Sequence, residues 1–258
     1  MTNLSKFKIL FLAAGVGRRF GKKGKIIPKS LISIRKKTLI ENIVQILKKR
    51  KAKEISIILG YKSKKIIKVL RKIQGIKFNF INIKDFRKNN HGCSWHHFKK
   101  YWYVEKKPML LLHTDISFNP KFLDNIIKSK KKDIIGIHSN KNIMKETSLV
   151  IKANKEYQIK EINLKTHISN NVGEVIGINK ISPKTNERIF NFMDKFLKGK
   201  NKKLPWELVI NKFIKITNFN KFSILKNQNY FWINVNYNKD YLNLKNKKNY
   251  YKKYFKLN

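Results

Sequence analysis

The chain has 258 residues, with 60 basic and 15 acidic side chains, a net charge of +45, 41% hydrophobic residues and 12% aromatic residues. This apolar and aromatic content excludes a disordered polycation, and the length is enough for one substantial core. Only seven basic residues are arginines, whereas lysine, isoleucine and asparagine, which AT-rich codons favour, are abundant throughout. Proteins that specifically recognise the phosphates and bases of nucleic acids prefer arginine, so the charge alone does not indicate a specific nucleic-acid partner.

The first half of the chain alternates apolar runs with amphipathic segments. Strands are predicted over 6–13, 54–60, 77–83, 109–114 and 133–138, and helices over 38–50, 63–73, 93–103 and 120–129. Strands that are apolar on both faces and alternate with helices predict an α/β fold, in which a mostly parallel sheet carries helices on both faces.

The pattern changes after about residue 144. Alternating strands over 148–153, 157–164 and 172–179 are separated by short polar turns, which predicts a small antiparallel excursion. Helices over 183–198 and 205–213, strands over 222–225 and 230–235, and a basic final helix over 237–258 follow. Since no Pro/Gly/Ser-rich linker divides the chain, a single domain is expected. Its lone Cys93 suits a reducing compartment such as the cytoplasm, and no run approaches the 18 apolar residues of a membrane span.

The loop after the first strand is suited to polyphosphate. It carries Gly15, Gly17 and Arg19, then three lysines among glycines, and then Pro28-Lys29. Glycines let backbone N–H groups approach anionic oxygens, and the two cations can neutralise them. The loop fits neither a dinucleotide fingerprint, because Phe20 stands at its last glycine position, nor a P-loop.

The segment LAAGVGRRFG followed by PKSL resembles the signature L-A-A-G-x-G-x-R, spacer, P-K-x-L. This signature belongs to the nucleotidyltransferase family that includes sugar-phosphate nucleotidylyltransferases, the molybdenum cofactor guanylyltransferase and phosphocholine cytidylyltransferases. Later segments, such as Asn89-Asn90-His-Gly-Cys-Ser94 and Pro205-Trp206-Glu207, are similar to the small phosphocholine-type enzymes. The resemblance implies a Rossmann-like nucleotidyltransferase sheet, with a nucleotide-binding half over about 1–143 and an acceptor-binding half over about 144–236.

The resemblance also implies roles for individual residues. Arg19, Lys29 and Asp115 are the expected catalytic residues, and Asp115 with Asn234 would hold Mg²⁺. The nucleotide would contact Leu12, Ala13, Ala14, Gly15, Gly17, Arg19, Lys29, Asn90 and Ser94.

Asn234 departs from the family pattern, which has an aspartate there. An amide oxygen can ligate Mg²⁺ but brings no charge, so metal affinity and rate should suffer unless Asp240, Glu174 or Glu207 compensates. Two other features have open alternatives. His113, inside a predicted strand, is expected to be a hydrogen-bonded core residue. The four tryptophans form either core or an acceptor pocket, and they are Trp95, Trp102, Trp206 and Trp232.

The sequence therefore predicts a magnesium-dependent enzyme that joins a nucleoside triphosphate to a small phosphorylated acceptor and releases pyrophosphate. The resemblance favours CTP as the nucleotide and phosphocholine or a sugar phosphate as the acceptor, for the decoration of a surface polysaccharide or lipid. A catalytically impaired nucleotide-binding homologue is the first alternative, and a basic nucleic-acid-binding protein is the second. The oligomeric state stays open.

Overall fold

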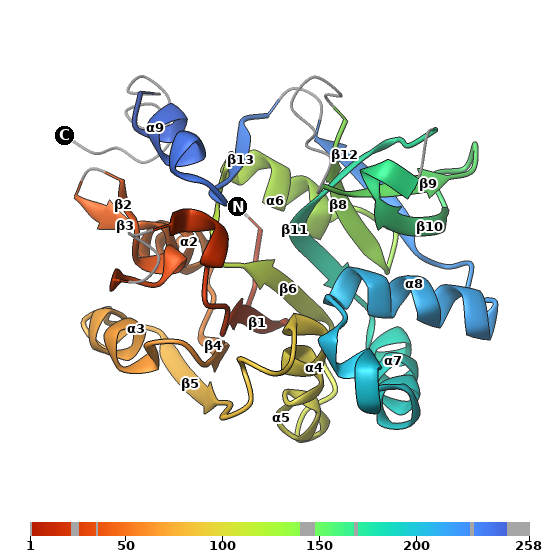
Figure 1. The fold of residues 1–258 in the computed structure, drawn as a ribbon, viewed down its shortest axis with the longest axis horizontal. Coiled ribbons are helices and arrows are strands. Elements are labelled where there is room, and N and C mark those ends of the chain that lie inside the picture. Colours follow the sequence, from red (N-terminus) through yellow and green to blue (C-terminus); the bar gives the residue numbers. More distant parts are fainter. Residues whose placement is uncertain are drawn as a thin grey trace.

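A mixed sheet of nine strands forms the centre of the computed structural model, which describes residues 2–21, 26–34, 36–139, 148–167, 170–227 and 230–246 (Figure 1). Four neighbouring strands are parallel, in the order β6-β1-β4-β5. They are β1 (Lys8–Ala13), β4 (Glu54–Leu59), β5 (Lys77–Asn82) and β6 (Met109–His113). Leu10 and Phe11 point to opposite faces of β1 and both are fully buried, as the continuous apolar run predicts.

The antiparallel part is organised by one long strand. β11 (Gly173–Ile181) lies antiparallel to β6 and also pairs with β8 (Ile134–His138) and β9 (Leu149–Ala153). β10 (Ile159–Leu164) pairs antiparallel with β9, and β12 (Ser223–Asn227) pairs parallel with β8. The antiparallel excursion predicted in the C-terminal half is confirmed, and it continues the same sheet.

Helices cover both faces of the sheet, as predicted (Figure 1). One face is covered by α2 (Leu39–Lys48), α3 (Ser63–Leu70) and α6 (Pro120–Lys128), and the other by α4 (His91–His96), α5 (Lys99–Tyr103), α7 (Pro183–Phe196) and α8 (Trp206–Thr217). A capping box starts α2, because Thr38 and Glu41 each bond the other's backbone N–H.

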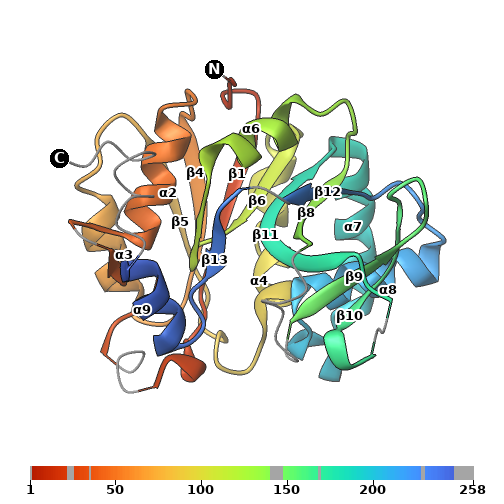
Figure 2. The same cartoon turned by 90° about the horizontal axis from the view of Figure 1, so that it is seen from above.

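Two small sheets were not predicted, although the strand expected over 230–235 corresponds to one of their strands. β7 (Ile116–Phe118) pairs antiparallel with β13 (Trp232–Asn234), and β2 (Ser33–Ile34) pairs with β3 (Lys37–Thr38). A separate apolar cluster of Phe20, Ile32, Ile34, Leu39, Val235 and Leu244 joins these segments to α9 (Asn238–Asn246). Figure 2 shows β13 between the two halves of the molecule, with α9 on the side of α2 and α3. This cluster holds β13 and α9 against the loop that follows β1.

Two predicted helices differ in the structure. The helix expected over 93–103 is two helices, α4 and α5, separated at residues 97–98. The final helix begins as predicted, but residues 247–258 lie outside the described residues, as do the lysines at 22, 23 and 25. No helix within the described ranges is long and apolar enough to cross a membrane.

Candidate active site

A cleft of about 1990 Å³ opens at the carboxyl ends of β1 and β6. Every residue expected at the site lines it: Leu12, Ala13, Ala14, Gly15, Gly17, Arg19, Lys29, Asn90, Ser94, Asp115 and Asn234. Additional cations line the same cleft, namely Arg87, Lys88, Lys203 and Lys239. Against these stand four acids, Asp115, Glu174, Glu207 and Asp240. The cleft is therefore basic, which suits a polyanionic ligand.

The loop after β1 is shaped by Gly17. Its φ is +66°, a left-handed conformation that favours glycine, and its carbonyl accepts a bond from Phe20 N at 2.9 Å. A Cβ there would lie 2.9 Å from Cγ of Lys29. In contrast, a Cβ on Gly15 would meet nothing within 4 Å. Gly17 thus lets Lys29 pass close to the loop, while Gly15 leaves open space on the cleft side.

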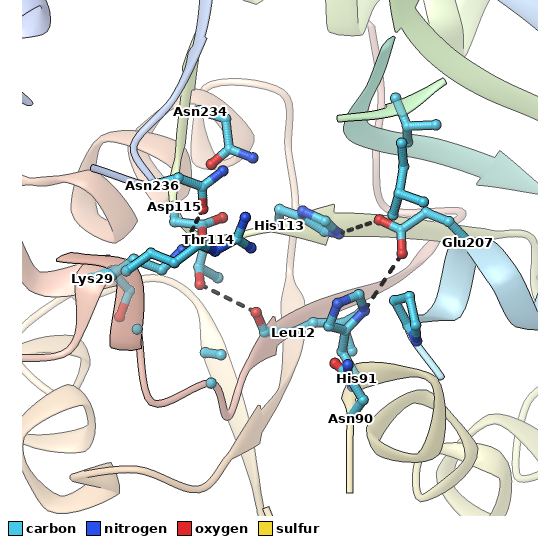
Figure 3. Close-up of a pocket in the computed structure, with 18 of the residues that line it drawn as sticks. Leu12, Lys29, Asn90, His91, His113, Thr114, Asp115, Glu207, Asn234 and Asn236 are labelled. Atoms are coloured by element: carbon cyan, nitrogen blue, oxygen red, sulfur yellow. Dashed lines mark hydrogen bonds and ion pairs between the residues drawn. The ribbon is translucent and has the colours of Figure 1, made fainter. Parts of the chain in front are cut away.

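Lys29 and Asp115 form the polar centre of the cleft (Figure 3). The Lys29 ammonium donates to the Asp115 carboxylate and, at 2.9 Å, to Oδ1 of Asn236. Burial would raise the pKa of Asp115, but the charge of Lys29 and the hydrogen bonds outweigh it, so the pKa of Asp115 lies below its ordinary value. Asp115 is therefore ionised at neutral pH.

β13 brings two asparagines to this centre. Asn234 pairs with Ile116 in the small sheet, and the Val235 N–H donates to the Asp115 carbonyl at 2.8 Å. Oδ1 of Asn234 is buried and has no hydrogen-bond partner in the described part of the chain. The backbone of Asn236 is held by Asp240, whose Oδ2 accepts its N–H at 2.9 Å. Figure 3 shows both asparagines beside Asp115.

Asn236 is a site residue that the sequence analysis missed. Its signal was the repeat of asparagine at positions 234 and 236, two residues apart, after a short apolar strand. The strand ends at Asn234, and a turn in which the Asn236 N–H donates to the Asn234 carbonyl at 3.2 Å brings the second amide to the same centre.

The predicted helix segment near residue 91 supplies the cleft's opposite wall. Asn90 caps α4 by accepting the His91 N–H at 2.7 Å, and its Nδ2 donates to the Lys203 carbonyl at 3.2 Å. Ser94 is 3% exposed and donates to the Asn90 carbonyl at 3.4 Å. Both residues line the cleft, but their hydrogen bonds to the chain show that they also stabilise this wall.

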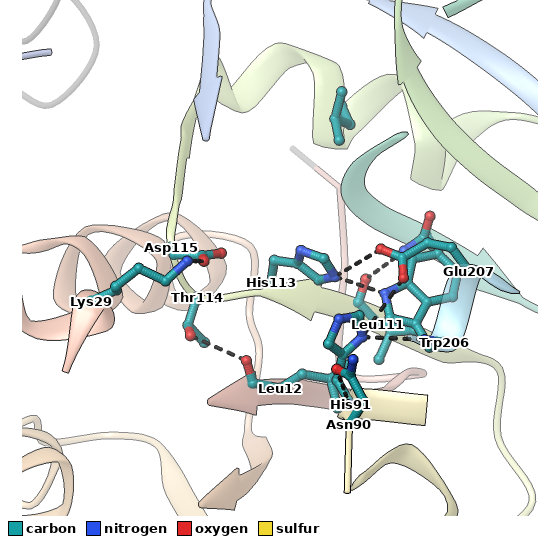
Figure 4. Close-up of polar contacts among 12 residues, drawn as sticks. Leu12, Lys29, Asn90, His91, Leu111, His113, Thr114, Asp115, Trp206 and Glu207 are labelled. Carbon is teal, nitrogen blue, oxygen red and sulfur yellow. Dashed lines mark hydrogen bonds and ion pairs between the residues drawn. The ribbon is translucent and has the colours of Figure 1, made fainter. Parts of the chain in front are cut away.

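A second polar group lies on the other side of His113 from Asp115 (Figure 4). Glu207, at the start of α8, has its carboxylate oxygens 3.7 Å from His91 Nδ1 and 3.7 Å from His113 Nε2. Burial, and secondarily the charge of Asp115, raises the pKa of Glu207 to about 8. Burial also lowers the pKa of both histidines. The three side chains are therefore largely neutral at pH 7.

Several expectations about these residues change. His113 accepts a hydrogen bond, as expected, but it lines the cleft rather than the core. Of the three acids considered as substitutes for the missing aspartate, Asp240 supports the backbone of Asn236, and Glu207 belongs to the histidine group. Among the tryptophans, Trp232 lines the cleft, while the other three are fully buried core residues, Trp95, Trp102 and Trp206.

We compared the sequence and the fold of the chain with those of known proteins. No protein-family model matches the chain, and no curated protein matches it by sequence. Among solved structures, the inositol-1-phosphate CTP transferase from T. maritima matches with a TM-score of 0.77 and 14% identity, over 94% of this chain and 96% of that chain. CTP:phosphocholine cytidylyltransferase from Streptococcus pneumoniae matches with a TM-score of 0.75 and 19% identity, over 93% and 98%.

A UDP-glucose pyrophosphorylase complexed with UDP-glucose matches with a TM-score of 0.74 and 20% identity, over 98% of this chain and all (100%) of that chain. The matches span almost the whole of both chains, so they concern the complete fold and not one half of it. The chain therefore has the Rossmann-like fold of nucleotidyltransferases, the family that its sequence resembles.

Proposed function

We propose that the protein is a nucleotidyltransferase that joins a nucleoside triphosphate to a small phosphorylated acceptor. The observation that carries the proposal is the Lys29–Asp115 pair, set beside the open Gly15 loop in one basic cleft. Such a cleft can hold two polyanions next to each other, which is the main task of an enzyme that transfers a nucleotidyl group. The fold and the signature of the loop support the same reaction.

In the proposed reaction, a phosphate oxygen of the acceptor attacks the α-phosphorus of the nucleotide. The bond from that phosphorus to the oxygen bridging the β-phosphate breaks, and pyrophosphate leaves with the electron pair. Loop amides at Gly15 and Gly17 cradle the triphosphate, Arg19 neutralises the leaving pyrophosphate, and Lys29 stabilises charge at the α-phosphate. No side chain needs to act as a nucleophile.

Magnesium fits the oxygen donors of this site. Asp115 offers a carboxylate, Asn234 a buried amide oxygen without a partner, and Asn236 a second amide oxygen. Mg²⁺ prefers oxygen ligands and is commonly held by one or two carboxylates together with substrate phosphates. When bound, the ion would neutralise phosphate charge and orient the reacting groups. The Lys29 ammonium, which pairs with Asp115, also brings one positive charge to this group of oxygen donors.

The two halves of the chain have different proposed tasks. Residues 1–143 bind the nucleotide, with Asn90 and Ser94 near the base or the acceptor, and residues 144–236 bind the acceptor. CTP is the proposed nucleotide, because two of the matched structures are named as CTP-dependent transferases and the sequence resembles the phosphocholine-type enzymes. The proposed role of the activated product is the decoration of a surface polysaccharide or lipid. The proposed location of the reaction is the cytoplasm, where nucleoside triphosphates are supplied.

One observation favours a second function. Two amides stand beside Asp115, so the proposed magnesium ligands include one carboxylate, and Lys29 neutralises it. A protein with this charge balance can bind a nucleotide and turn it over slowly or not at all. It would be an impaired homologue that binds CTP or its product.

Pyrophosphate release separates these functions. It is measured with each of the four nucleoside triphosphates, Mg²⁺ and a panel of phosphorylated acceptors. We expect release with at least one pair, and we expect Asp115→Ala and Lys29→Ala to abolish it. Asp194→Ala is the control, because this exposed acid pairs with His96 and Lys99 outside the cleft.

Nucleotide binding without release would support the impaired homologue. No release with any pair, together with tight binding of nucleic acid at moderate salt, would refute the proposed function and favour the nucleic-acid-binding alternative.

A further inference from the structure

The group formed by His91, His113 and Glu207 has no role in the reaction described above. It lies where the N-termini of α4 and α8 meet the end of β6, and its three side chains line the cleft (Figure 4). Figure 4 shows His113 between Asp115 on one side and Glu207 on the other. One cleft therefore holds two distinct polar centres.

Hydrogen bonds from Trp206 determine which nitrogen of each histidine carries the proton. The Trp206 backbone N–H donates to His91 Nδ1 at 3.2 Å, and its indole Nε1–H donates to His113 Nε2 at 2.7 Å. A nitrogen that accepts a hydrogen bond has no proton, so His91 is protonated at Nε2 and His113 at Nδ1. The two nitrogens closest to Glu207 are therefore acceptors.

The two imidazole nitrogens therefore offer no donor to Glu207, whose carboxyl interacts with its own backbone N–H. Its side chain is 4% exposed, and Oε2 has no hydrogen-bond partner among the described residues. Burial of a carboxylate with so few donors is unfavourable, so this carboxyl keeps its proton at neutral pH, in agreement with its raised pKa. The residue lines the cleft, and Oε2 itself is buried in the cleft wall.

The group is also rigid. A Cβ on Gly177 would lie 2.5 Å from His113 Cγ, so β11 passes directly against the imidazole, and Gly177 has a φ of +76° that favours glycine. Trp206 itself is fully buried and packs edge-to-face on Trp95, with ring centroids 6.2 Å apart. The acceptors are therefore preorganised rather than free to rotate toward other partners.

The ligand that fits is a cation able to donate hydrogen bonds. A metal ion does not fit, because both facing nitrogens already accept bonds from Trp206 and no metal-binding group of three His, Cys, Asp or Glu occurs in the described ranges. A quaternary ammonium brings charge but no N–H, and a hydroxyl brings a donor but no charge. A protonated amine brings both, and it supplies what Oε2 lacks.

We propose that Glu207 binds an N–H-bearing ammonium group of the acceptor substrate, with His91 and His113 held beside it by Trp206. This inference rests on the proposed function, since the phosphate of the same acceptor would lie near Lys29, where it attacks the α-phosphorus. The substrate class is then a short phosphorylated amine, which is anionic at one end and cationic at the other.

A series of acceptors that differ at one atom tests the inference. Pyrophosphate release is measured with O-phosphoethanolamine, its N-methyl and N,N-dimethyl derivatives, phosphocholine and 2-hydroxyethyl phosphate. We expect the lowest acceptor KM for amines with an N–H, and a KM at least tenfold higher for phosphocholine and for the neutral hydroxyl compound. Glu207→Gln should remove this discrimination and leave the KM of the nucleotide within about twofold.

The control is Glu187→Gln, because Glu187 is an exposed acid of α7 that pairs with Lys106 at 2.7 Å outside the cleft. Thermal unfolding confirms that each variant is folded. Equal use of phosphocholine and O-phosphoethanolamine by the unsubstituted protein would overturn the inference and leave the proposed function intact. A Glu207→Gln variant that loses kcat without a change in acceptor KM would overturn it as well.

A binding measurement covers the case in which no acceptor is turned over and the proposed function fails. Calorimetric titration with O-phosphoethanolamine and with phosphocholine is carried out on the protein and on Glu207→Gln. Binding of O-phosphoethanolamine that is at least tenfold tighter and depends on Glu207 would support the amine site. Equal binding by both proteins, or no binding, would overturn it.

Discussion

Replacing Glu207 by glutamine should change how the stability of the protein depends on pH. The pKa of Glu207 rises from 4.5 to about 8 because the side chain is buried, and the charge of Asp115 adds to the rise while a backbone hydrogen bond opposes it. The folded state thus binds a proton that the unfolded state has lost. The stability that Glu207 contributes is therefore largest when the pH is below its pKa in the unfolded state. This contribution is lost as the pH rises through its pKa in the folded state.

The magnitude follows from these two pKa values. With a folded pKa of about 8, the contribution of Glu207 falls by about 1.4 kcal/mol between pH 7 and pH 9. His91 and His113 have a pKa of 6.5 in the unfolded state and lower values in the folded state, so they destabilise the protein only at lower pH. Their effect on the free energy of unfolding is therefore almost constant above pH 7.5. Glu207→Gln removes the titration and keeps the shape of the side chain.

The assay is urea unfolding at pH 7, 8 and 9, followed by tryptophan fluorescence, on the protein and on Glu207→Gln. Groups that both proteins share cancel in the difference between their free energies of unfolding. We expect this difference to shift by about 1.4 kcal/mol in favour of the variant from pH 7 to pH 9. Glu187→Gln should show a constant difference. A constant difference for Glu207→Gln as well would refute the burial argument.

Three further predictions concern the Lys29 end of the cleft. Gly15→Ala should leave the melting temperature unchanged, since its Cβ meets open space, but it should raise the nucleotide KM. Gly17→Ala should lower the free energy of unfolding in urea by about 1–2 kcal/mol and displace Lys29, because Gly17 has a positive φ and its Cβ would contact Lys29. An unchanged nucleotide KM in Gly15→Ala would contradict the loop's role. Asn234→Asp should lower the melting temperature in EDTA, raise it in Mg²⁺ and tighten Mn²⁺ binding; equal curves would contradict a metal site there. Asp240→Asn should weaken the support of Asn236 and lower turnover severalfold without loss of folding, and unchanged turnover would contradict that support.

The regular elements of the fold were accessible from local sequence patterns. The apolar runs of β1, β4 and β6 and the amphipathic pattern of α2 depend on neighbouring residues, and those predictions are confirmed. Strands of two or three residues, such as β7, carry no periodicity, and they form because a distant segment pairs with them. The short break between α4 and α5 has no Gly or Pro to mark it.

The candidate site shows the same division. The Gly15 loop, Lys29 and Asp115 have recognisable spacing, so sequence alone indicated them, and the structure places them in one cleft. The group around Glu207 could not be predicted, because its partners lie 116 and 94 residues away in the chain and their protonation depends on Trp206. Its nature appears only when burial and hydrogen bonds are known.

The most direct test of nucleotidyl transfer follows the label of the nucleotide. The protein is incubated with Mg²⁺, a phosphorylated acceptor and CTP carrying ³²P at either the α or the γ position. We expect the α label in a new product that also contains the acceptor, the γ label in pyrophosphate, and neither transfer in Asp115→Ala. Transfer of the γ label to the acceptor, or an α label that stays in CTP with every acceptor, would contradict the proposed reaction.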